Sequence, residues 1–296
     1  MFKSGFVTII GKPNVGKSTL INAIIGEKVS IVSPKANTTR DKIVGVYNSP
    51  NTQIIFTDTP GLLNPKNKLD EYMSSSITSS MDNVDVILYV LDGSKPFTTD
   101  ELTRIQTYIN TKTPVIVIVN KIDATKPEKL YPELAKLNSI QNISAVMPLS
   151  ALKKKNIEQL IKEISNHLKD NVKYFSDDMF TDKPIRFQVS ELIREKTLWF
   201  LKEEVPTSLA VELTTFSEEE DLTVIEANII CEKDSHKKII VGKGGEMIKK
   251  ISTQSRQALE KFLNRKIFLQ LFVKVKPNWK QENNILSSLG YDKKNI

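Results

Sequence analysis

The clearest chemistry in this sequence lies in residues 11–18, which read G-x-x-x-x-G-K-S. Residues at this spacing form a phosphate-binding loop, because their backbone N–H groups can surround an anionic phosphate. The amine of Lys17 would reach the β- and γ-phosphates of a nucleotide, and the hydroxyl of Ser18 would bind Mg²⁺. The segment therefore predicts binding of a nucleoside triphosphate with Mg²⁺.

The elements on either side of this loop support the prediction. Residues 6–10 are a short apolar β-type stretch, and residues 19–25 have a helical pattern that Gly26 closes. A strand, a glycine loop and a helix in this order bring the positive end of the helix dipole to the phosphate. The residues expected to contact the nucleotide here are Gly11, Asn14, Val15, Gly16, Lys17, Ser18 and Thr19.

Two further segments carry groups suited to the γ-phosphate and the metal ion. Asp58 and Gly61 form a D-x-x-G pattern, in which the carboxylate can hold Mg²⁺ through water and the glycine N–H can bond the γ-phosphate. Thr38 and Thr39 lie in the polar segment 29–41, and a threonine there, with Thr39 favoured, can complete the Mg²⁺ shell. The predicted metal site is Ser18, Thr39 and Asp58, and the predicted catalytic residues are Lys17, Thr39 and Gly61.

An N-K-x-D pattern predicts which base is bound. Asn120, Lys121 and Asp123 follow the strand expected over residues 114–119. The carboxylate of Asp123 can accept hydrogen bonds from N1–H and the 2-amino group of guanine, and adenine offers neither donor. A carboxylate left unpaired penalises ATP, so the pattern selects GTP. The backbone of three residues after the next strand is expected near the guanine O6: Ser150, Ala151 and Leu152.

The elements that must position these groups alternate between strand and helix. Apolar runs at residues 85–91 and 114–119 are typical of buried parallel strands, and residues 42–47 and 53–57 read as a hairpin. Helices are expected over residues 67–81, 99–110, 129–137 and 156–168. The prediction is a doubly wound α/β GTPase domain that binds its ligand at the carboxyl ends of the strands.

The second part of the chain has a different element order. Residues 171–183 are polar and lack a period, so they read as a linker between a GTPase domain over residues 1–170 and a smaller α+β domain over residues 184–296. After the linker, the sequence predicts α-β-β-α-α-β, with a helix over 185–205 and a last strand over 267–273. This order matches the type II KH fold.

A G-x-x-G segment lies between the two central helices of this second domain. Such a loop clamps the backbone of about four single-stranded nucleotides. The predicted RNA-binding residues are Gly242, Lys243, Gly244, Gly245, Lys249 and Lys250. Residues 233–280 hold thirteen basic and three acidic side chains. Charge alone is also compatible with a solvated basic surface, so the glycine loop carries the RNA prediction.

Bulk properties limit the class of protein. The chain has 296 residues, 40% of them hydrophobic, and a formal net charge of +7. The single cysteine, Cys231, leaves no partner for an intramolecular disulfide and argues for a reducing compartment. No apolar run approaches the roughly 18 residues of a membrane span. We therefore expect a soluble, cytoplasmic protein. As a separate expectation, we take it to be monomeric.

These motifs together resemble those of translation-factor-class GTPases, and the KH-like half resembles Era-type GTPases within that class. Residues 186–196, 239–245 and 273–276 are similar to the opening helix, the glycine loop and the last strand of the Era-type KH domain. The resemblance implies a Mg²⁺-dependent GTPase that converts GTP to GDP and acts in late 30S ribosomal subunit maturation. It further implies binding to the 3′ end of 16S ribosomal RNA and peripheral association with the inner face of the cell membrane.

One departure from Ras-like GTPases bears on catalysis. Leu62 and Leu63 follow Gly61, where those enzymes carry a glutamine that orients the attacking water. Asn14 resembles the asparagine that seats a K⁺ ion in related enzymes, although it could simply stabilise the turn.

Two alternative functions stay open. One is an RNA-binding chaperone that uses GTP mainly as a structural ligand, and the other is a membrane-associated signalling GTPase whose KH fold binds something else.

Overall fold

The computed structural model describes residues 2–62, 64–169, 171–202 and 204–292, and it divides into two units. The first unit comprises residues 1–30, 39–64 and 73–182, and the second comprises residues 31–38, 65–72 and 183–296. Two short segments near the nucleotide motifs thus belong to the second unit by their contacts. The domain limits expected from the sequence, 1–170, 171–183 and 184–296, stay a prediction.

The first unit is built on a six-stranded sheet with the order β2-β3-β1-β4-β5-β6. The strands are β1 (Lys3–Gly11), β2 (Ile43–Ser49), β3 (Thr52–Asp58), β4 (Val86–Asp92), β5 (Val115–Asn120) and β6 (Ala145–Pro148). All neighbours are parallel except β2 and β3, which form the expected antiparallel hairpin. The chain builds first on one side of β1 and then on the other, so the carboxyl end of β1 is the switch point where such sheets bind ligands.

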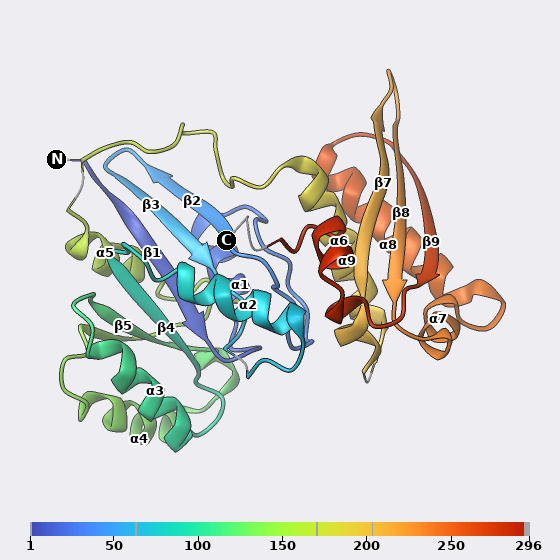
Figure 1. Ribbon diagram of the computed structural model, residues 1–296. Helices are drawn as coiled ribbons and strands as arrows, with labels where there is room; N and C mark the ends of the chain where they lie inside the picture. Colours follow the sequence, from blue (N-terminus) through green and yellow to red (C-terminus); the bar gives the residue numbers. More distant parts are fainter. Residues whose placement is uncertain (1, 63, 170, 203, 293–296) are drawn as a thin grey trace. The chain divides into compact units, whose positions relative to one another are not determined.

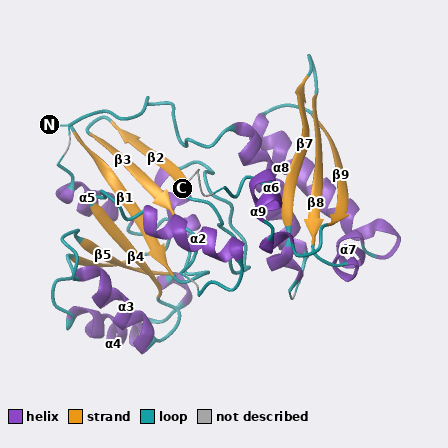
Figure 2. Ribbon diagram, in the orientation of Figure 1, coloured by secondary structure: helices purple, strands orange, loops and turns teal. Residues whose placement is uncertain are grey.

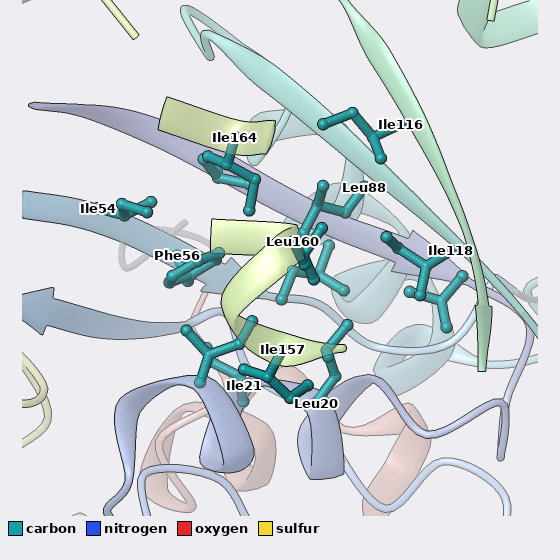
Figure 3. Packing of buried hydrophobic residues seen from close by; sticks show 14 of the residues in the cluster. Leu20, Ile21, Ile54, Phe56, Leu88, Ile116, Ile118, Ile157, Leu160 and Ile164 are labelled. Atoms are coloured by element: carbon teal, nitrogen blue, oxygen red, sulfur yellow. The ribbon is translucent and has the colours of Figure 1, made fainter. Parts of the chain in front are cut away.

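Helices cover both faces of this sheet, as a doubly wound fold requires (Figure 1). They are α1 (Lys17–Ile25), α2 (Lys68–Ser79), α3 (Thr99–Ile109), α4 (Pro127–Asn138) and α5 (Ile157–His167). Figure 3 shows the core on one face, where Leu20 and Ile21 of α1 and Leu160 of α5 meet apolar strand residues. The other face packs against α2, α3 and α4 through residues such as Ile77 and Ile105. Both cores anchor the strand ends from which the motif residues project.

The stretch expected to be a linker packs onto the hairpin of the first unit. The backbone N–H of Val46 donates to the carbonyl of Phe180 at 2.9 Å. The side chain of Gln53 is fully buried, and its Oε1 accepts from the backbone N–H of Tyr174 at 2.7 Å. Backbone pairing and a buried amide explain why a polar, aperiodic segment is nevertheless ordered.

The second unit has a three-stranded sheet with helices on one face (Figure 2). Its elements are α6 (Ile185–Phe200), β7 (Ala210–Glu218), β8 (Thr223–Cys231), α7 (Asp234–Val241), α8 (Glu246–Leu263), β9 (Ile267–Val275) and α9 (Asn283–Ser288). β7 and β8 are antiparallel, whereas β8 and β9 are parallel. The α-β-β-α-α-β order predicted from the sequence is confirmed, and the connection from β8 to β9 contains the glycine loop.

Two details of this unit differ from the sequence prediction. The helix expected over residues 185–205 ends at Phe200, because the chain turns inward there to bury Leu201 and Val205. A short 3-10 turn (Val205–Ser208) follows, with Pro206 at its start. The final helix α9 was not predicted. Among the described residues, no helix combines the length and hydropathy that crossing a bilayer would need.

Candidate nucleotide and RNA sites

The phosphate-binding loop connects β1 to α1, as the sequence predicts. Three of its residues have positive φ: Gly11 at 149°, Asn14 at 63° and Gly16 at 98°. A side chain at Gly16 would be strained and would also place its Cβ 2.3 Å from Nδ2 of Asn120. The glycine is therefore required both by the turn and by the close approach of β5.

Lys17 begins α1 and lies under the loop. Its side chain is nearly buried, and Nζ donates to the carbonyl oxygens of Gly11 at 3.0 Å and Lys12 at 3.1 Å. Burial lowers the pKa of Lys17 to about 8, and the nearby Asp58 carboxylate opposes that change. The ammonium group is thus held by loop carbonyls where a phosphate-binding lysine is expected.

The three predicted metal ligands converge. The hydroxyl of Ser18 donates to Oδ2 of Asp58 at 2.8 Å and lies 2.8 Å from the hydroxyl of Thr39. Thr38 instead hydrogen-bonds the carbonyl of Lys35 at 2.7 Å. The geometry therefore supports the choice of Thr39 over its neighbour.

Asp58 places a carboxylate oxygen beside the hydroxyls of Ser18 and Thr39. Burial raises the pKa of its carboxyl above the usual value, and the charge of Lys17 opposes the shift. Its Oδ1 is buried and makes no hydrogen bond within the described part of the chain. A buried carboxylate oxygen beside two hydroxyls is a donor set that Mg²⁺ or its bound water satisfies.

The side chains of Asn120 and Lys121 make contacts that the sequence did not predict. Asn120 donates from Nδ2 to the carbonyl of Val15 at 2.9 Å, and its Oδ1 accepts from the backbone N–H of Ala151 at 3.0 Å. Lys121 donates to the carbonyl of Asn14 and to Asp92 at the end of β4. Asn120 thus joins three of the predicted motifs into one structure.

The predicted guanine-binding groups lie together. Asp123 is exposed, and its Oδ1 accepts from the hydroxyl of Ser150 at 2.5 Å. Ala151 is buried, whereas Leu152 is largely exposed. The carboxylate is therefore oriented by a buried serine and still accessible to a ligand.

Gly61 lies against the phosphate-binding loop. A Cβ at Gly61 would approach the backbone nitrogen of Pro13 to 2.8 Å, and the next residue, Leu62, donates its N–H to the carbonyl of Gly11 at 3.1 Å. Leu63, the other apolar residue at this position, lies outside the described residues. No side chain that could orient water follows Gly61 in the sequence until Asn64.

The glycine loop of the second unit has the backbone that a phosphate clamp needs. Gly242, Gly244 and Gly245 all have positive φ, at 75°, 60° and 82°. A Cβ at Gly244 or Gly245 would meet nothing within 4 Å, whereas a Cβ at Gly242 would lie 2.7 Å from that of Met247. Gly242 is thus required for packing, and the other two leave the loop surface open.

The predicted basic contacts around this loop differ in their surroundings. Lys243 and Lys249 are exposed. The Nζ of Lys250 lies 4.7 Å from the ring centre of Phe200, a cation–π distance. Trp279 is buried and donates from Nε1 to the carbonyl of Ser208 at 3.0 Å, so it is a core residue and not a base-stacking one.

Comparisons with known proteins agree with this geometry. Residues 6–121 match the family described as 50S ribosome-binding GTPase, and residues 204–280 match the KH domain. GTPase Era of Clostridium acetobutylicum is 48% identical over 291 residues, which cover 98% of both chains. The chain belongs to the Era GTPase family. Era of Clostridioides difficile is 45% identical over 99% of this chain.

Solved Era structures match the whole chain as well. An Era crystallised with MgGDPNP and nucleotides 1506–1542 of 16S ribosomal RNA superposes with a TM-score of 0.94 and 39% identity over 99% of this chain and all of that one. A single-residue variant of Aquifex aeolicus Era bound to GDP and AlF4⁻ gives the same TM-score over 98% of this chain. The Era fold, with a P-loop GTPase domain and a KH domain, is therefore shown for this chain.

Proposed function

We propose that this Era-family GTPase is a Mg²⁺-dependent switch that binds the 3′ end of 16S ribosomal RNA and acts in late 30S subunit maturation. The observation that carries the proposal is the full-length similarity to an Era crystallised with MgGDPNP and nucleotides 1506–1542 of that RNA. The convergence of Ser18, Thr39 and Asp58 beside the phosphate-binding loop supports the GTPase part. The open glycine loop supports the RNA part.

The residues of the first unit have distinct roles toward GTP in this proposal. The loop backbone and Lys17 hold the β- and γ-phosphates, and the N–H of Gly61 binds the γ-phosphate. Asp123 reads the guanine edge from the position in which Ser150 holds it. Asn120 links the phosphate-binding loop to the base-binding segment through its hydrogen bonds to Val15 and Ala151.

The donor set described above fits Mg²⁺. Ser18 and Thr39 would supply hydroxyl oxygens and Asp58 a carboxylate, which are ligands that this hard cation prefers. When bound, Mg²⁺ neutralises charge that develops on the phosphate oxygens. The hydroxyl and carboxylate contacts within this cluster hold the three side chains close together.

Placement of the attacking water needs a group other than a glutamine side chain, and we propose that K⁺ seated by Asn14 takes part. GTP turnover is then expected to be several-fold faster in K⁺ than in Na⁺ buffer, measured by phosphate release. An Asn14→Ala variant should lose this difference. Asn14 has φ 63°, a backbone angle that glycine adopts more easily than alanine. An Asn14→Gly variant is therefore the cleaner test, because it keeps the turn and removes the side-chain amide. Equal wild-type rates in the two salts would contradict the K⁺ proposal.

RNA binding by the glycine loop is tested with a single-stranded RNA copy of nucleotides 1506–1542. A Gly244→Asp variant should bind this RNA at least about tenfold more weakly, because the new carboxylate repels phosphate at the clamp. The control is Gly290→Asp, since Gly290 also has positive φ and open space around it. Fluorescence anisotropy at several salt concentrations measures both. Undiminished binding by Gly244→Asp would show that the RNA lies elsewhere.

Three further features stay predictions from the sequence. They are a cytoplasmic location, a monomeric state and weak association with the inner face of the membrane. Exposed basic side chains such as Lys243 and Lys249 could contact an anionic surface as well as RNA. Competition between anionic vesicles and RNA for the purified protein distinguishes the two ligands.

A further inference from the structure

The segment that precedes the predicted metal ligand Thr39 is held by the first helix of the second unit. Residues 31–38 belong to that unit by their contacts, whereas Thr39 belongs to the first unit. The side chain of Ile31 is 4% exposed and lies in the same apolar cluster as Leu198 of α6. A residue that comes shortly before the metal site in the sequence is therefore part of the core of the second unit.

Helix α6 also binds both ends of this segment through hydrogen bonds. Near its start, the backbone N–H of Val32 donates to Oε2 of Glu195 at 3.3 Å, and the carbonyl of Val32 accepts from Nε1 of Trp199 at 3.0 Å. At its end, Nη2 of Arg194 donates to the carbonyl of Thr38. Three side chains of one helix thus bind the backbone of residues 31–38 at both ends.

Hydrogen bonds inside the segment make it compact. The hydroxyl of Thr38 donates to the carbonyl of Lys35 at 2.7 Å and lies 2.7 Å from the hydroxyl of Ser33. The backbone N–H of Lys35 donates to the same Ser33 hydroxyl at 3.1 Å. These contacts leave the segment little conformational freedom of its own, so the contacts with α6 determine where its last residue lies.

The surroundings of Arg194 fix the orientation of its guanidinium group. The side chain is 1% exposed, and Nε and Nη2 donate to the two carboxylate oxygens of Glu191, each at 2.6 Å. A buried ion pair loses much of its attraction to the cost of desolvation, so it is weak evidence for a role in stability. A bidentate pair does fix the plane of the guanidinium, and here it directs Nη2 to the Thr38 carbonyl.

The peptide bond after Thr38 carries this constraint to the metal site. The hydroxyl of Thr39 lies 2.8 Å from that of Ser18, which donates to Asp58 at 2.8 Å. The carbonyl of Thr38 and the nitrogen of Thr39 share one rigid peptide plane. A change in the position of that carbonyl therefore displaces the Thr39 hydroxyl relative to the other two predicted ligands.

We propose that Arg194 is a positioning residue for the Mg²⁺–GTP complex, because its bond to the Thr38 carbonyl holds the Thr39 hydroxyl beside Ser18 and Asp58. The inference rests on the proposed role of Thr39 as a metal ligand and extends it to a residue of the second unit. A threonine in this kind of segment is ordered by contacts with the γ-phosphate and Mg²⁺. Arg194 therefore supports binding of GTP more than binding of GDP.

A double variant of the full chain, Glu191→Met with Arg194→Met, tests this role. Two apolar side chains can replace a buried ion pair without loss of the fold, and here they remove the donor to Thr38. Binding of a fluorescent GTP analogue is titrated in Mg²⁺ and in EDTA. The affinity in Mg²⁺ should fall by about 10- to 100-fold, the usual effect of removing a group that orients a metal ligand. The affinity in EDTA and the affinity for GDP should stay as in the wild type.

Two further variants make the comparison specific. Arg194→Lys keeps a positive charge beside Glu191 but lacks the planar fork that reaches both Glu191 and Thr38, so Mg²⁺-dependent GTP affinity should fall here too. The matched control is Arg256→Met with Glu260→Met, which removes a 2.6 Å ion pair from a different helix of the same unit, α8. This control should bind GTP as the wild type does.

Hydrogen exchange without nucleotide gives a readout that does not depend on the metal ion. Peptides that cover residues 31–38 should exchange faster in both Arg194 variants than in the wild type, because the segment has lost one of its contacts with α6. The Arg256 and Glu260 control should leave this exchange unchanged. Thermal unfolding of the same samples shows whether each variant is folded.

A Thr39→Ala variant separates failure of this inference from failure of the proposed function. If Thr39→Ala loses Mg²⁺-dependent GTP affinity and the Arg194 variants do not, the inference is overturned and the metal site stands. An equal loss in Mg²⁺ and in EDTA also overturns it, because Arg194 would then support the fold in general. If Thr39→Ala keeps full affinity in Mg²⁺, the proposed role of Thr39 fails, and the inference fails with it.

Discussion

A Lys17→Met variant is expected to lose GTP turnover by about 100- to 1000-fold, the usual effect of removing one positioned donor from a transition state. Methionine fills the buried space but leaves the β- and γ-phosphates without their ammonium partner. Phosphate release under single-turnover conditions measures the loss. The same assay on the wild type tests the alternative in which GTP is only a structural ligand, since that alternative requires no hydrolysis with or without RNA.

The substitution should also change how stability depends on pH. The pKa of Lys17 is about 8 in the folded protein, compared with an ordinary value of 10.5 for a lysine side chain. Between these values the unfolded chain binds more protons than the folded one, so stability rises with pH across that window. The rise from this group amounts to about 3 kcal/mol, and Lys17→Met should remove it. Chemical unfolding at a series of pH values from 7 to 10.5 measures the effect.

Lys12→Met is the control for both measurements. Lys12 lies in the same loop, but its Nζ pairs with the exposed Asp100 at 3.2 Å. We expect this variant to keep turnover within about threefold of the wild type, because an exposed ion pair contributes little. If Lys17→Met hydrolysed GTP at the wild-type rate, the assignment of the loop as the catalytic phosphate site would be wrong.

An Asp123→Asn variant is expected to change the base specificity of the nucleotide site from guanine toward xanthine. The asparagine amide cannot accept from both N1–H and the 2-amino group of guanine, so GTP affinity should fall at least about 100-fold. Xanthine carries a carbonyl oxygen in place of the 2-amino group, and the new amide can donate to it. The affinity for xanthosine triphosphate should therefore rise. Titration with both nucleotides, followed by fluorescence, gives the ratio.

The surroundings of Asp123 allow the substitution to change base recognition without disturbing the fold. Its side chain is exposed, and the hydroxyl of Ser150 can donate to an asparagine oxygen as it does to the carboxylate. Glu128→Gln is the matched control, because it removes an exposed carboxylate at the start of α4. An unchanged ratio of GTP to xanthosine triphosphate affinity in Asp123→Asn would rule out the predicted role in reading the base.

The features that could be predicted from the sequence are those that short local patterns determine. The phosphate-binding loop, the Asp58 segment and the glycine loop are short, and the two loops contain glycines with backbone angles that few other residues tolerate. Strand ends were predictable too, because buried parallel strands are continuous apolar runs. Such features can be read without knowing which segments meet in space.

The remaining features depend on contacts between distant segments. Asn120 was predicted to bind the nucleotide, yet its hydrogen bonds to Val15 and Ala151 appear only once three motifs are brought together. Packing ended the helix at Phe200, because burial of Leu201 outweighed helix propensity. The ordering of residues 171–182 required the buried side chain of Gln53, which contacts Tyr174 and Phe175 more than a hundred residues away in the sequence.

The burial of Lys17 has a consequence for the binding step itself. Phosphates arriving at the loop place negative charge beside an amine that is half neutral near pH 8, and that charge favours the protonated form. In mildly alkaline solution, nucleotide binding therefore takes up a proton from the solvent, and release of the nucleotide returns it. Heats of binding measured by calorimetry will consequently differ between buffers of different ionisation enthalpy, and apparent affinity will decline as alkalinity increases.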